Sequence, residues 1–245
     1  MDALSQFELK PVFGALGDAV GFTQSSAHML LAVGIITALM MLGTRRRALI
    51  PGRVQALAES AYEFIHDLVT GQIGDEGKRF FPFVFSLFMF ILVGNLLGLL
   101  PYAFTFTSHI AVTFALAAVV FLLVTIVALA IHGTKFFGYF FPEGAPKALA
   151  PLIIPIELIS YLSRPVSLSV RLFANMVAGH VMLKVFATFV VLIGGSAGVL
   201  GVLGASLPLA LNVALVGFEI LVAFLQAYVF AILTSIYLHD AVHLH

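Results

Sequence analysis

Five acidic or basic side chains stand in the apolar stretch of residues 151–193. They are Glu157, Arg164, Arg171, His180 and Lys184. An ionised group at the centre of a bilayer costs roughly 2.5–3.5 kcal/mol, so a chain that keeps several either holds them at another depth or uses them. Carboxylate and imidazole groups can load and release protons near neutral pH, whereas an arginine stays charged. These residue types favour proton transfer past a fixed positive charge.

The polar side chains of this stretch recur at helical spacing. At 100° per residue, six of them fall within an arc of about 80°. The six are Glu157, Ser160, Arg164, Ser167, Arg171 and Asn175. The remaining side chains of that helix are mainly Leu, Ile, Val and Phe, so we expect one narrow polar stripe on an apolar helix. His180 and Lys184 fall near the opposite side and serve another surface or depth.

A second stripe is predicted on residues 206–238. Asn212, Glu219, Gln226 and Tyr237 fall within an arc of about 40° on an otherwise apolar helix. Two tilted helices in a hairpin, each with such a stripe, can enclose a wet path inside the protein. Glu157, His180 and Glu219 are then candidate proton carriers, and Arg171 is a fixed cation.

Structural roles compete with these interpretations. Arg164 precedes Pro165 near the inner end of its segment and could equally extend to lipid head groups. The serines and asparagines of the stripes could join helices through hydrogen bonds, which we favour for the serines. Asn95 lies inside the small-xxx-small pattern formed by Gly94 and Gly98, so we assign it to helix packing.

The composition of this 245-residue chain is that of an integral membrane protein. Hydrophobic residues make up 61% and charged residues 10%, against about half and a quarter in ordinary soluble domains. A soluble fold of this length lacks the polar surface to cover so much apolar material. The composition excludes a disordered chain, a nucleic-acid-binding protein and a secreted disulfide scaffold. The 12 basic and 12 acidic residues leave no net charge, and there is no cysteine.

Three apolar runs are predicted to span the membrane within a single membrane domain. They cover residues 27–43, 80–100 and 109–132, and from residue 80 to residue 134 the chain has no Asp, Glu, Lys or Arg. Residues 1–26 form a polar outer segment without a signal-peptide pattern.

Residues 52–74 are too polar to span and are predicted to form an amphipathic helix on the membrane surface. Leu57, Ala61, Ile65 and Leu68 recur at helical spacing and define its expected apolar face. The opposite face is acidic rather than lysine-rich, which favours contact with protein over contact with anionic lipid.

The last two apolar segments, residues 151–193 and 206–238, are predicted to form the tilted hairpin of the proton path. A helix from residue 156 to residue 193 would measure roughly 60 Å, twice the hydrocarbon core of about 30 Å, so it must tilt, bend or lie nearly flat. The Gly-rich sequence GGSAGVLGVLGAS joins the two segments and is predicted to be an outer turn. The expected fold is an all-α integral membrane protein with about four spanning or strongly tilted helices, one surface helix and a long, near-horizontal C-terminal helical hairpin.

Basic residues set the predicted orientation. Arg45, Arg46 and Arg47 directly follow the first span, and the positive-inside rule places such a cluster in the cytoplasm. Lys147 falls in a later inner loop, whereas Lys10 lies on the outer side. The N-terminus is therefore expected outside and the C-terminus inside the cell.

Long motifs in the chain resemble those of one known family. The sequence SRPVSLSVRLFANMVAGH, residues 163–180, resembles the signature of subunit a of F-type ATP synthases, in which an asparagine follows an arginine by four residues. Here these are Arg171 and Asn175. GFEILVAFLQAYVFAILTSIYL, residues 217–238, is similar to the last helix of the family, and GNLLGLLP, residues 94–101, also matches. The likeness extends over essentially the whole chain.

The resemblance implies the membrane stator of a rotary motor, whose last two helices lie nearly flat against a ring of c subunits. Two offset aqueous half-channels would then reach the ring from opposite sides. Arg171 matches the essential arginine of the family, and Gln226 matches the glutamine beside it. His180 and Glu219 match the pair of the outer half-channel, and Glu157 matches an acid of the inner one. Asn175 belongs to the same set of expected proton-translocation residues.

One departure from the common pattern is informative. Many bacterial members carry an acid at the position of His180 and a histidine at that of Glu219. Here the two are exchanged, as in mitochondrial-like members, which points to a mitochondrion-related bacterial lineage. The pair still supplies one imidazole and one carboxylate.

The resemblance also implies partners and a location. The expected partners are the c-ring proteolipids, subunit b of the peripheral stalk, membrane lipids and protons, without nucleic acid. We expect a non-catalytic channel subunit that needs no cofactor or metal, and we interpret the C-terminal histidines as a solvated tail. The bacterial inner membrane is the expected location, ahead of the mitochondrial inner membrane.

Other functions remain open from the residues alone. An ion-coupled secondary transporter would use intramembrane charges similarly, but such transporters usually show internal repeats, and none is evident here. An intramembrane enzyme is disfavoured because no HExxH motif is present. A purely structural subunit would leave both polar stripes unexplained.

Overall fold

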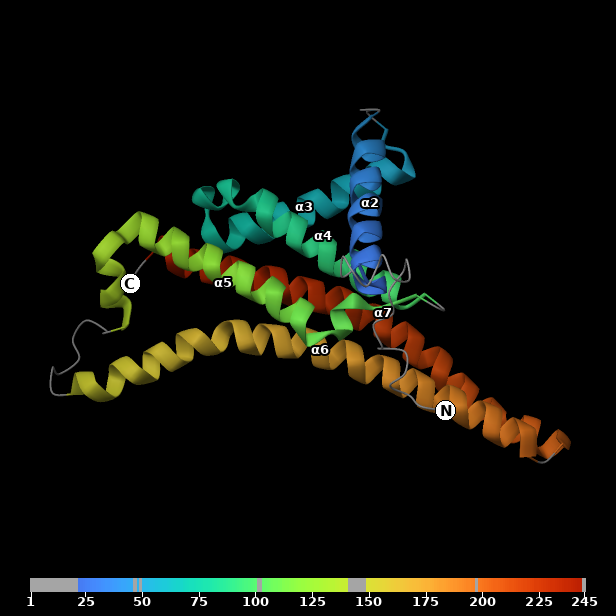
Figure 1. Ribbon diagram of the computed structural model, residues 1–245. Helices are drawn as coiled ribbons and strands as arrows, with labels where there is room; N and C mark the ends of the chain where they lie inside the picture. Colours follow the sequence, from blue (N-terminus) through green and yellow to red (C-terminus); the bar gives the residue numbers. More distant parts are fainter. Residues whose placement is uncertain are drawn as a thin grey trace. The chain divides into compact units, whose positions relative to one another are not determined.

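The computed structural model describes residues 22–45, 48, 50–100, 103–140, 149–196 and 198–243. Several predictions fall outside these residues: most of the outer segment with Lys10, the loop arginines Arg46 and Arg47, the inner-loop Lys147, and the terminal His245. Every regular element in the described part is helical (Figure 1), which confirms the predicted all-α membrane fold.

The helices follow one another along the chain with short connections. The α-helices are α2 (Gln24–Arg45), α3 (Arg53–Ile73), α4 (Phe81–Gly98), α5 (Ile110–His132), α6 (Ala150–Ser196) and α7 (Gly198–Val242). Three short 3-10 helices lie between them: η2 (Asp75–Arg79), η3 (Phe106–Ser108) and η4 (Gly133–Phe140). The α-helices other than α3 are long and apolar enough to cross a membrane, as judged by length and composition.

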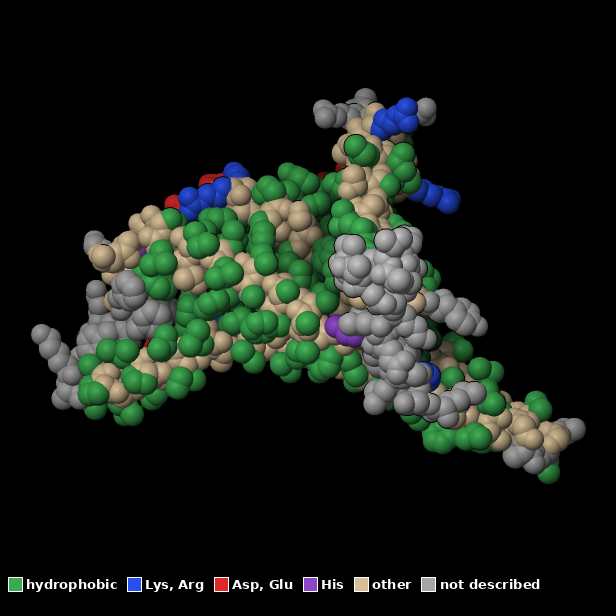
Figure 2. Space-filling model, in the orientation of Figure 1, with side chains coloured by type: hydrophobic (Ala, Val, Ile, Leu, Met, Phe, Trp, Pro, Cys, Tyr) green, Lys and Arg blue, Asp and Glu red, His purple; other side chains and the backbone are tan. Residues whose placement is uncertain are grey.

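The predicted boundaries differ little from the observed helices in the first part of the chain. The span expected at 27–43 extends over Gln24–Arg45, and those at 80–100 and 109–132 correspond to Phe81–Gly98 and Ile110–His132. Large apolar side chains lie exposed on the long helices, for example Leu30 and Met41 of α2. Figure 2 shows hydrophobic side chains over much of the visible surface, as expected for contact with lipid.

The chain divides into two compact units. Unit 1 contains residues up to Met41, Met89–His109 and Leu172–Ala227. Unit 2 contains Leu42–Phe88, Ile110–Arg171 and Tyr228–His245. The two long helices α6 and α7 each contribute residues to both units.

In unit 1, the end of α6 pairs with the start of α7, and the connection between them is shorter than predicted. Helix α6 continues to Ser196 and α7 begins at Gly198, not at residue 206. The Gly-rich stretch therefore forms the facing ends of two helices instead of a long turn. A Cβ atom on Gly204 would lie 3.1 Å from Ile193 Cγ2, so small residues let the backbones approach, as is common in membrane helices. Gly198 has a φ of 55°, which suits the sharp reversal.

In unit 1, α4 also holds the segment around η3. A Cβ atom on Gly94 would clash with the Phe106 ring, and one on Gly98 would clash with the Thr105 side chain. Phe106 is fully buried. The small-xxx-small pattern therefore serves close packing as predicted, but its partner is the η3 segment rather than another long helix.

We predict that Gly94→Ala destabilises the fold, because the added methyl group must displace the buried Phe106 ring. Overpacking of this kind costs about 1–3 kcal/mol, which thermal unfolding of the purified chain in detergent would detect. Gly34→Ala is the matched control, since it is also a glycine inside an α-helix and its Cβ would have no atom within 4 Å. Equal melting temperatures for the two variants would contradict the assigned contact.

In unit 2, α3 is amphipathic as expected, but its buried face is rotated from the predicted one. The buried residues are Ala58, Ile65, Val69 and Ile73, and Ile65 alone belongs to the predicted face. Leu57 is 58% exposed. The helix has two adjacent apolar faces, the predicted one and the buried one. The buried face is fixed by two close contacts: Ala58 lies against Gly43, and Val69 and Ile73 lie against Gly77.

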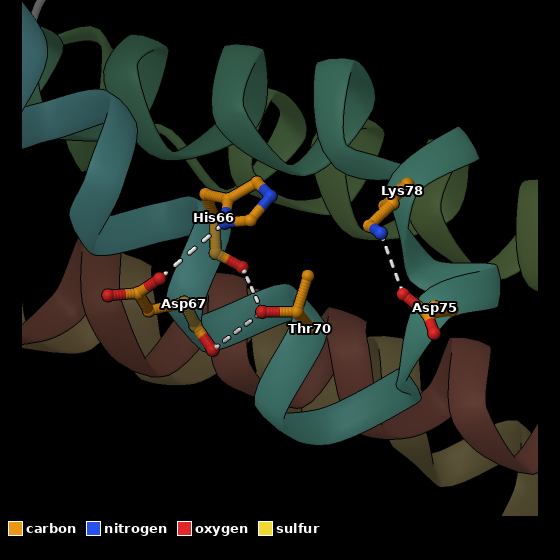
Figure 3. Close-up of polar contacts among 5 residues, drawn as sticks. All are labelled: His66, Asp67, Thr70, Asp75 and Lys78. Atoms are coloured by element: carbon orange, nitrogen blue, oxygen red, sulfur yellow. Dashed lines mark hydrogen bonds and ion pairs between the residues drawn. The ribbon is translucent and has the colours of Figure 1, made fainter.

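The polar end of α3 leads into η2 through local contacts (Figure 3). Thr70 Oγ1 donates a hydrogen bond to the His66 carbonyl at 2.8 Å, and Lys78 Nζ donates one to Asp75 Oδ1 at 2.7 Å. The Lys78 contact lowers the pKa of the exposed Asp75 carboxyl below its ordinary value. Gly74, with a φ of 79°, makes the turn between the two helices.

Candidate proton-transfer site

A buried carboxylate–imidazole pair lies in unit 1. Helix α6 supplies His180 and α7 supplies Glu219, and His180 Nδ1 lies 3.8 Å from Glu219 Oε1. The two side chains are 12% and 5% exposed. A Cβ atom on Gly179 would lie 2.5 Å from Glu219 Oε1, so the glycine before His180 makes room for the carboxylate. The fold thus brings together two of the predicted proton carriers.

The Glu219 carboxylate is unusual because it is buried without hydrogen bonds. Neither of its oxygens has a hydrogen-bond partner within the described part of the chain. A buried ionised carboxylate is costly without such partners, so this group gains from any proton or hydrogen-bond donor that reaches it. That property suits a group that binds and releases protons.

A further residue contacts this pair, although the sequence gives no sign of that contact. Thr105, in the segment just before η3, places Oγ1 2.8 Å from His180 Nε2. The predicted spans 80–100 and 109–132 leave Thr105 in the connection between them, and no spacing rule links that connection to a histidine on α6.

Asn95 of α4 joins the segments that surround the His180–Glu219 pair. Its side chain is fully buried, its Oδ1 accepts a hydrogen bond from Thr107 Oγ1 at 2.8 Å, and its Nδ2 donates one to the Ala223 carbonyl of α7 at 3.4 Å. Ala223 lies about one helical turn after Glu219. Asn95 therefore ties both the η3 segment and α7 to α4, which agrees with the predicted packing role.

The two polar stripes differ in exposure. On α6, Ser160, Ser167, Arg171 and Asn175 are exposed, and Glu157 is half-buried. On α7, Glu219 and Gln226 are buried at 4% and 6% exposure. Most of the α6 stripe is therefore exposed, whereas Glu157 and Arg164 are half-buried. The sequence could not show this, because helical spacing gives the direction of a stripe but not what lies against it.

Arg164 has a contact within the protein in unit 2. Its Nη1 lies 3.4 Å from Asp240 Oδ2, and its guanidinium lies 5.4 Å and 5.0 Å from the rings of Tyr161 and Tyr237. Such cation–π contacts stabilise a partly desolvated cation. Arg164 therefore contacts groups of the protein itself and does not reach only towards lipid head groups. Asp240 of α7 is its acidic partner.

The end of α7 is also fixed in unit 2. His132 Nε2 donates hydrogen bonds to the carbonyls of Ala241 and Val242 at 3.1 Å and 3.2 Å, which satisfies carbonyl groups that a helix end leaves open. The rings of His239 and His243 stack at 4.8 Å. Across the residues that the structure describes, no three His, Cys, Asp or Glu side chains gather as metal ligands would.

Comparison with known proteins decides the family. The family model described as "ATP synthase A chain" matches residues 26–239. The chain belongs to this family. Among curated relatives, the ATP synthase subunit a of Granulibacter bethesdensis is 64% identical over 245 residues, which cover 100% of this chain and 98% of the relative. Those of Acidiphilium cryptum and Gluconacetobacter diazotrophicus are 59% and 58% identical, and the matches cover 98% and 97% of these relatives.

Membership of the ATP synthase A chain family confirms the resemblance seen in the motifs. It also confirms the expected function of a proton-translocating stator subunit. The chain is one subunit of a complex with other ATP synthase subunits, in a bacterial membrane. The alphaproteobacterial source of these relatives agrees with the lineage that the exchanged histidine and glutamate suggested.

Proposed function

We propose that this chain carries protons to and from a ring of c-subunit proteolipids through two half-channels, which Arg171 keeps apart. The observation that supports this most strongly is the buried pair of His180 and Glu219. It offers an imidazole and a carboxylate in direct reach of one another, between two helices that are otherwise apolar.

The outer half-channel runs past Glu219 and His180. Protons cannot cross hydrocarbon unaided, so their path must be lined with polar groups. Glu219 binds a proton from the outer side and passes it on beside His180. The proton then neutralises a carboxylate of the ring, which removes most of the cost of turning that carboxylate into lipid.

The α6 stripe faces the ring. Arg171 and Asn175 are exposed in the single chain although neighbouring side chains are apolar, for example Val170 at 43% exposure. A cation on an apolar face is costly. An ionised carboxylate of the ring can pair with the guanidinium group of Arg171 and lower that cost.

Arg171 prevents a short circuit between the two half-channels. Its guanidinium stays protonated at any working pH, so it cannot relay a proton. Its positive charge repels a proton that would cross directly, and it attracts the ionised ring carboxylate as this passes. We assign Gln226 to the same step, as the family resemblance implies.

The inner half-channel includes Glu157. After nearly a full turn of the ring, the neutral carboxylate reaches this side and releases its proton. The half-buried Glu157 of α6 can accept protons on their way to the cytoplasm. Each charge moved through 100 mV releases about 2.3 kcal/mol, so several protons are needed for each ATP and leakage must be small.

The chain is a non-catalytic channel subunit of the bacterial inner membrane in this account, with its N-terminus outside and its C-terminus in the cytoplasm. The proposed partners are the c ring and subunit b of the peripheral stalk. Nucleotide chemistry takes place in other subunits.

Co-purification tests this proposal. The tagged chain, extracted in mild detergent, is expected to travel with a small two-helix proteolipid in excess over itself. Recovery of the chain as a solitary protein that transports an ion in vesicles would contradict the stator role and favour a secondary transporter.

A further inference from the structure

We propose that Thr105 is a positioning residue for proton transfer, because its hydroxyl group holds the His180 ring and selects which nitrogen faces Glu219. This inference rests on the proposed role of His180 and Glu219 in the outer half-channel. It begins from the 2.8 Å contact between Thr105 Oγ1 and His180 Nε2.

The two ring nitrogens of His180 face different partners. Nε2 meets the Thr105 hydroxyl, while Nδ1 lies 3.8 Å from Glu219 Oε1. In a neutral histidine one nitrogen carries the proton, and the hydrogen bond made by the other nitrogen decides which. When the Thr105 hydroxyl donates to Nε2, the ring proton must sit on Nδ1. It then points towards the Glu219 carboxylate, the oxygens of which have no hydrogen-bond partner within the described residues.

A hydroxyl group suits a ring that changes its charge. It can donate a hydrogen bond to neutral Nε2 and, after rotation, accept one from the protonated ring. A backbone carbonyl could only accept and a backbone amide could only donate. Thr105 can therefore stay bound to His180 through both states without movement of the backbone.

The surrounding contacts fix the hydroxyl in place. Ser108 Oγ donates to the Thr105 carbonyl at 2.6 Å, and Gly98 leaves the space that the Thr105 side chain fills. The amide of Phe104 donates to His28 Nε2 of α2 at 3.2 Å. The segment before η3 is thus held against α2 and α4. Through Thr105 it also contacts His180 of α6.

The titratable groups near the His180 ring come from several elements. Glu219 faces it from α7, and Lys184 follows it by one turn of α6. His28 and His109 flank Phe104, with ring distances of 6.1 Å and 5.2 Å. Substitutions at Thr105 leave all of these groups unchanged, so a change in pH dependence can be ascribed to the lost hydroxyl.

The test compares Thr105→Val with Thr105→Ser in ATP-driven proton pumping by inverted vesicles that hold the complete synthase. Valine keeps the shape but removes the hydroxyl. A hydrogen bond to a charged group is worth about ten-fold in an equilibrium, so we expect pumping per assembled complex to fall by about that factor. We also expect the alkaline limb of its pH profile to move towards lower pH, because valine cannot accept a hydrogen bond from the protonated ring. Serine should restore both the rate and the profile.

Thr107→Val is the matched control. It removes a buried hydroxyl from the same segment, but one that donates to Asn95 and not to His180. It should change the amount of assembled complex without moving the pH profile. If Thr105→Val keeps the wild-type profile, or if serine fails to rescue it, the positioning role is wrong.

Two further measurements keep the outcome clear. Glu219→Gln is assayed in the same vesicles. Normal pumping by that variant would refute the proton path itself. Slow pumping by Glu219→Gln together with normal pumping by Thr105→Val would refute only the inference on Thr105.

The second measurement is made on the wild-type complex. The ¹⁵N shifts of the His180 ring, identified by their loss in His180→Gln, should report a neutral ring protonated at Nδ1. A ring protonated at Nε2 would overturn the inference even if Thr105→Val does not assemble.

Discussion

Replacing Arg171 with lysine should abolish most coupled proton pumping, although the formal charge is unchanged. An ammonium group can lose its proton in an apolar environment, whereas a guanidinium group stays charged. Lysine also binds a carboxylate as a point charge and lacks the two-pronged geometry of arginine. We expect ATP-driven acidification of inverted vesicles to fall by about ten-fold or more, since one lost charge-assisted hydrogen bond of 1.5–3 kcal/mol already accounts for that factor.

Arg53→Lys is the control for this substitution. Arg53 is exposed at the start of α3, where both residues can reach water and serve equally. Its variant should pump normally. Wild-type pumping by Arg171→Lys, with equal amounts of assembled complex, would defeat the role assigned to the guanidinium group.

Replacing Glu219 with glutamine should have the second largest effect. The amide is nearly isosteric with the carboxyl group, so it fits the space beside Gly179, but it cannot bind and release a proton. Because no hydrogen bond to either Glu219 oxygen exists among the described residues, the substitution breaks none there. We expect assembly to remain normal and ATP-driven pumping to fall by about ten-fold or more, a loss that can reach the 10²–10⁴-fold contribution of a positioned acid–base group.

The matched control is Glu63→Gln on the exposed face of α3. It makes the same chemical change outside the proposed path and should leave pumping unaffected. Normal rates in Glu219→Gln vesicles would remove this residue from the path and leave His180 without a proton-carrying partner.

The main helices could be predicted because their causes are local in sequence. Long runs without charge indicate apolar helices, and helical spacing revealed the stripes that contain Arg171 and Glu219. The ends of α6 and α7 were predicted less well. Glycine is typical of turns in soluble proteins, whereas in membrane helices it lets backbones approach, and the contact between Gly204 and Ile193 shows the second use.

The contacts of the site could be predicted only in part. The family resemblance paired His180 with Glu219, and the structure brings them within 3.8 Å. Thr105 and Asp240 were missed, because a hydroxyl or a carboxylate far along the chain acquires its partner through tertiary packing alone. For the same reason the sequence could not show that most of the α6 stripe is exposed, whereas Glu219 and Gln226 of the α7 stripe are buried.

The rotated face of α3 has a similar explanation. Leu57 and Ala58 are both apolar and lie next to one another, so spacing alone cannot decide which of them is buried. The small residue Gly43 accepts Ala58 against it, and this packing choice leaves Leu57 exposed.

The central claim is that the guanidinium group of Arg171 keeps the two half-channels separate while the ring turns. The most direct test measures ATP-driven pumping and passive proton conductance for Arg171→Lys in the same vesicles, the second after removal of the catalytic sector. The account predicts that pumping is largely lost while passive conductance stays at or above the wild-type level. Wild-type pumping with unchanged conductance would contradict it.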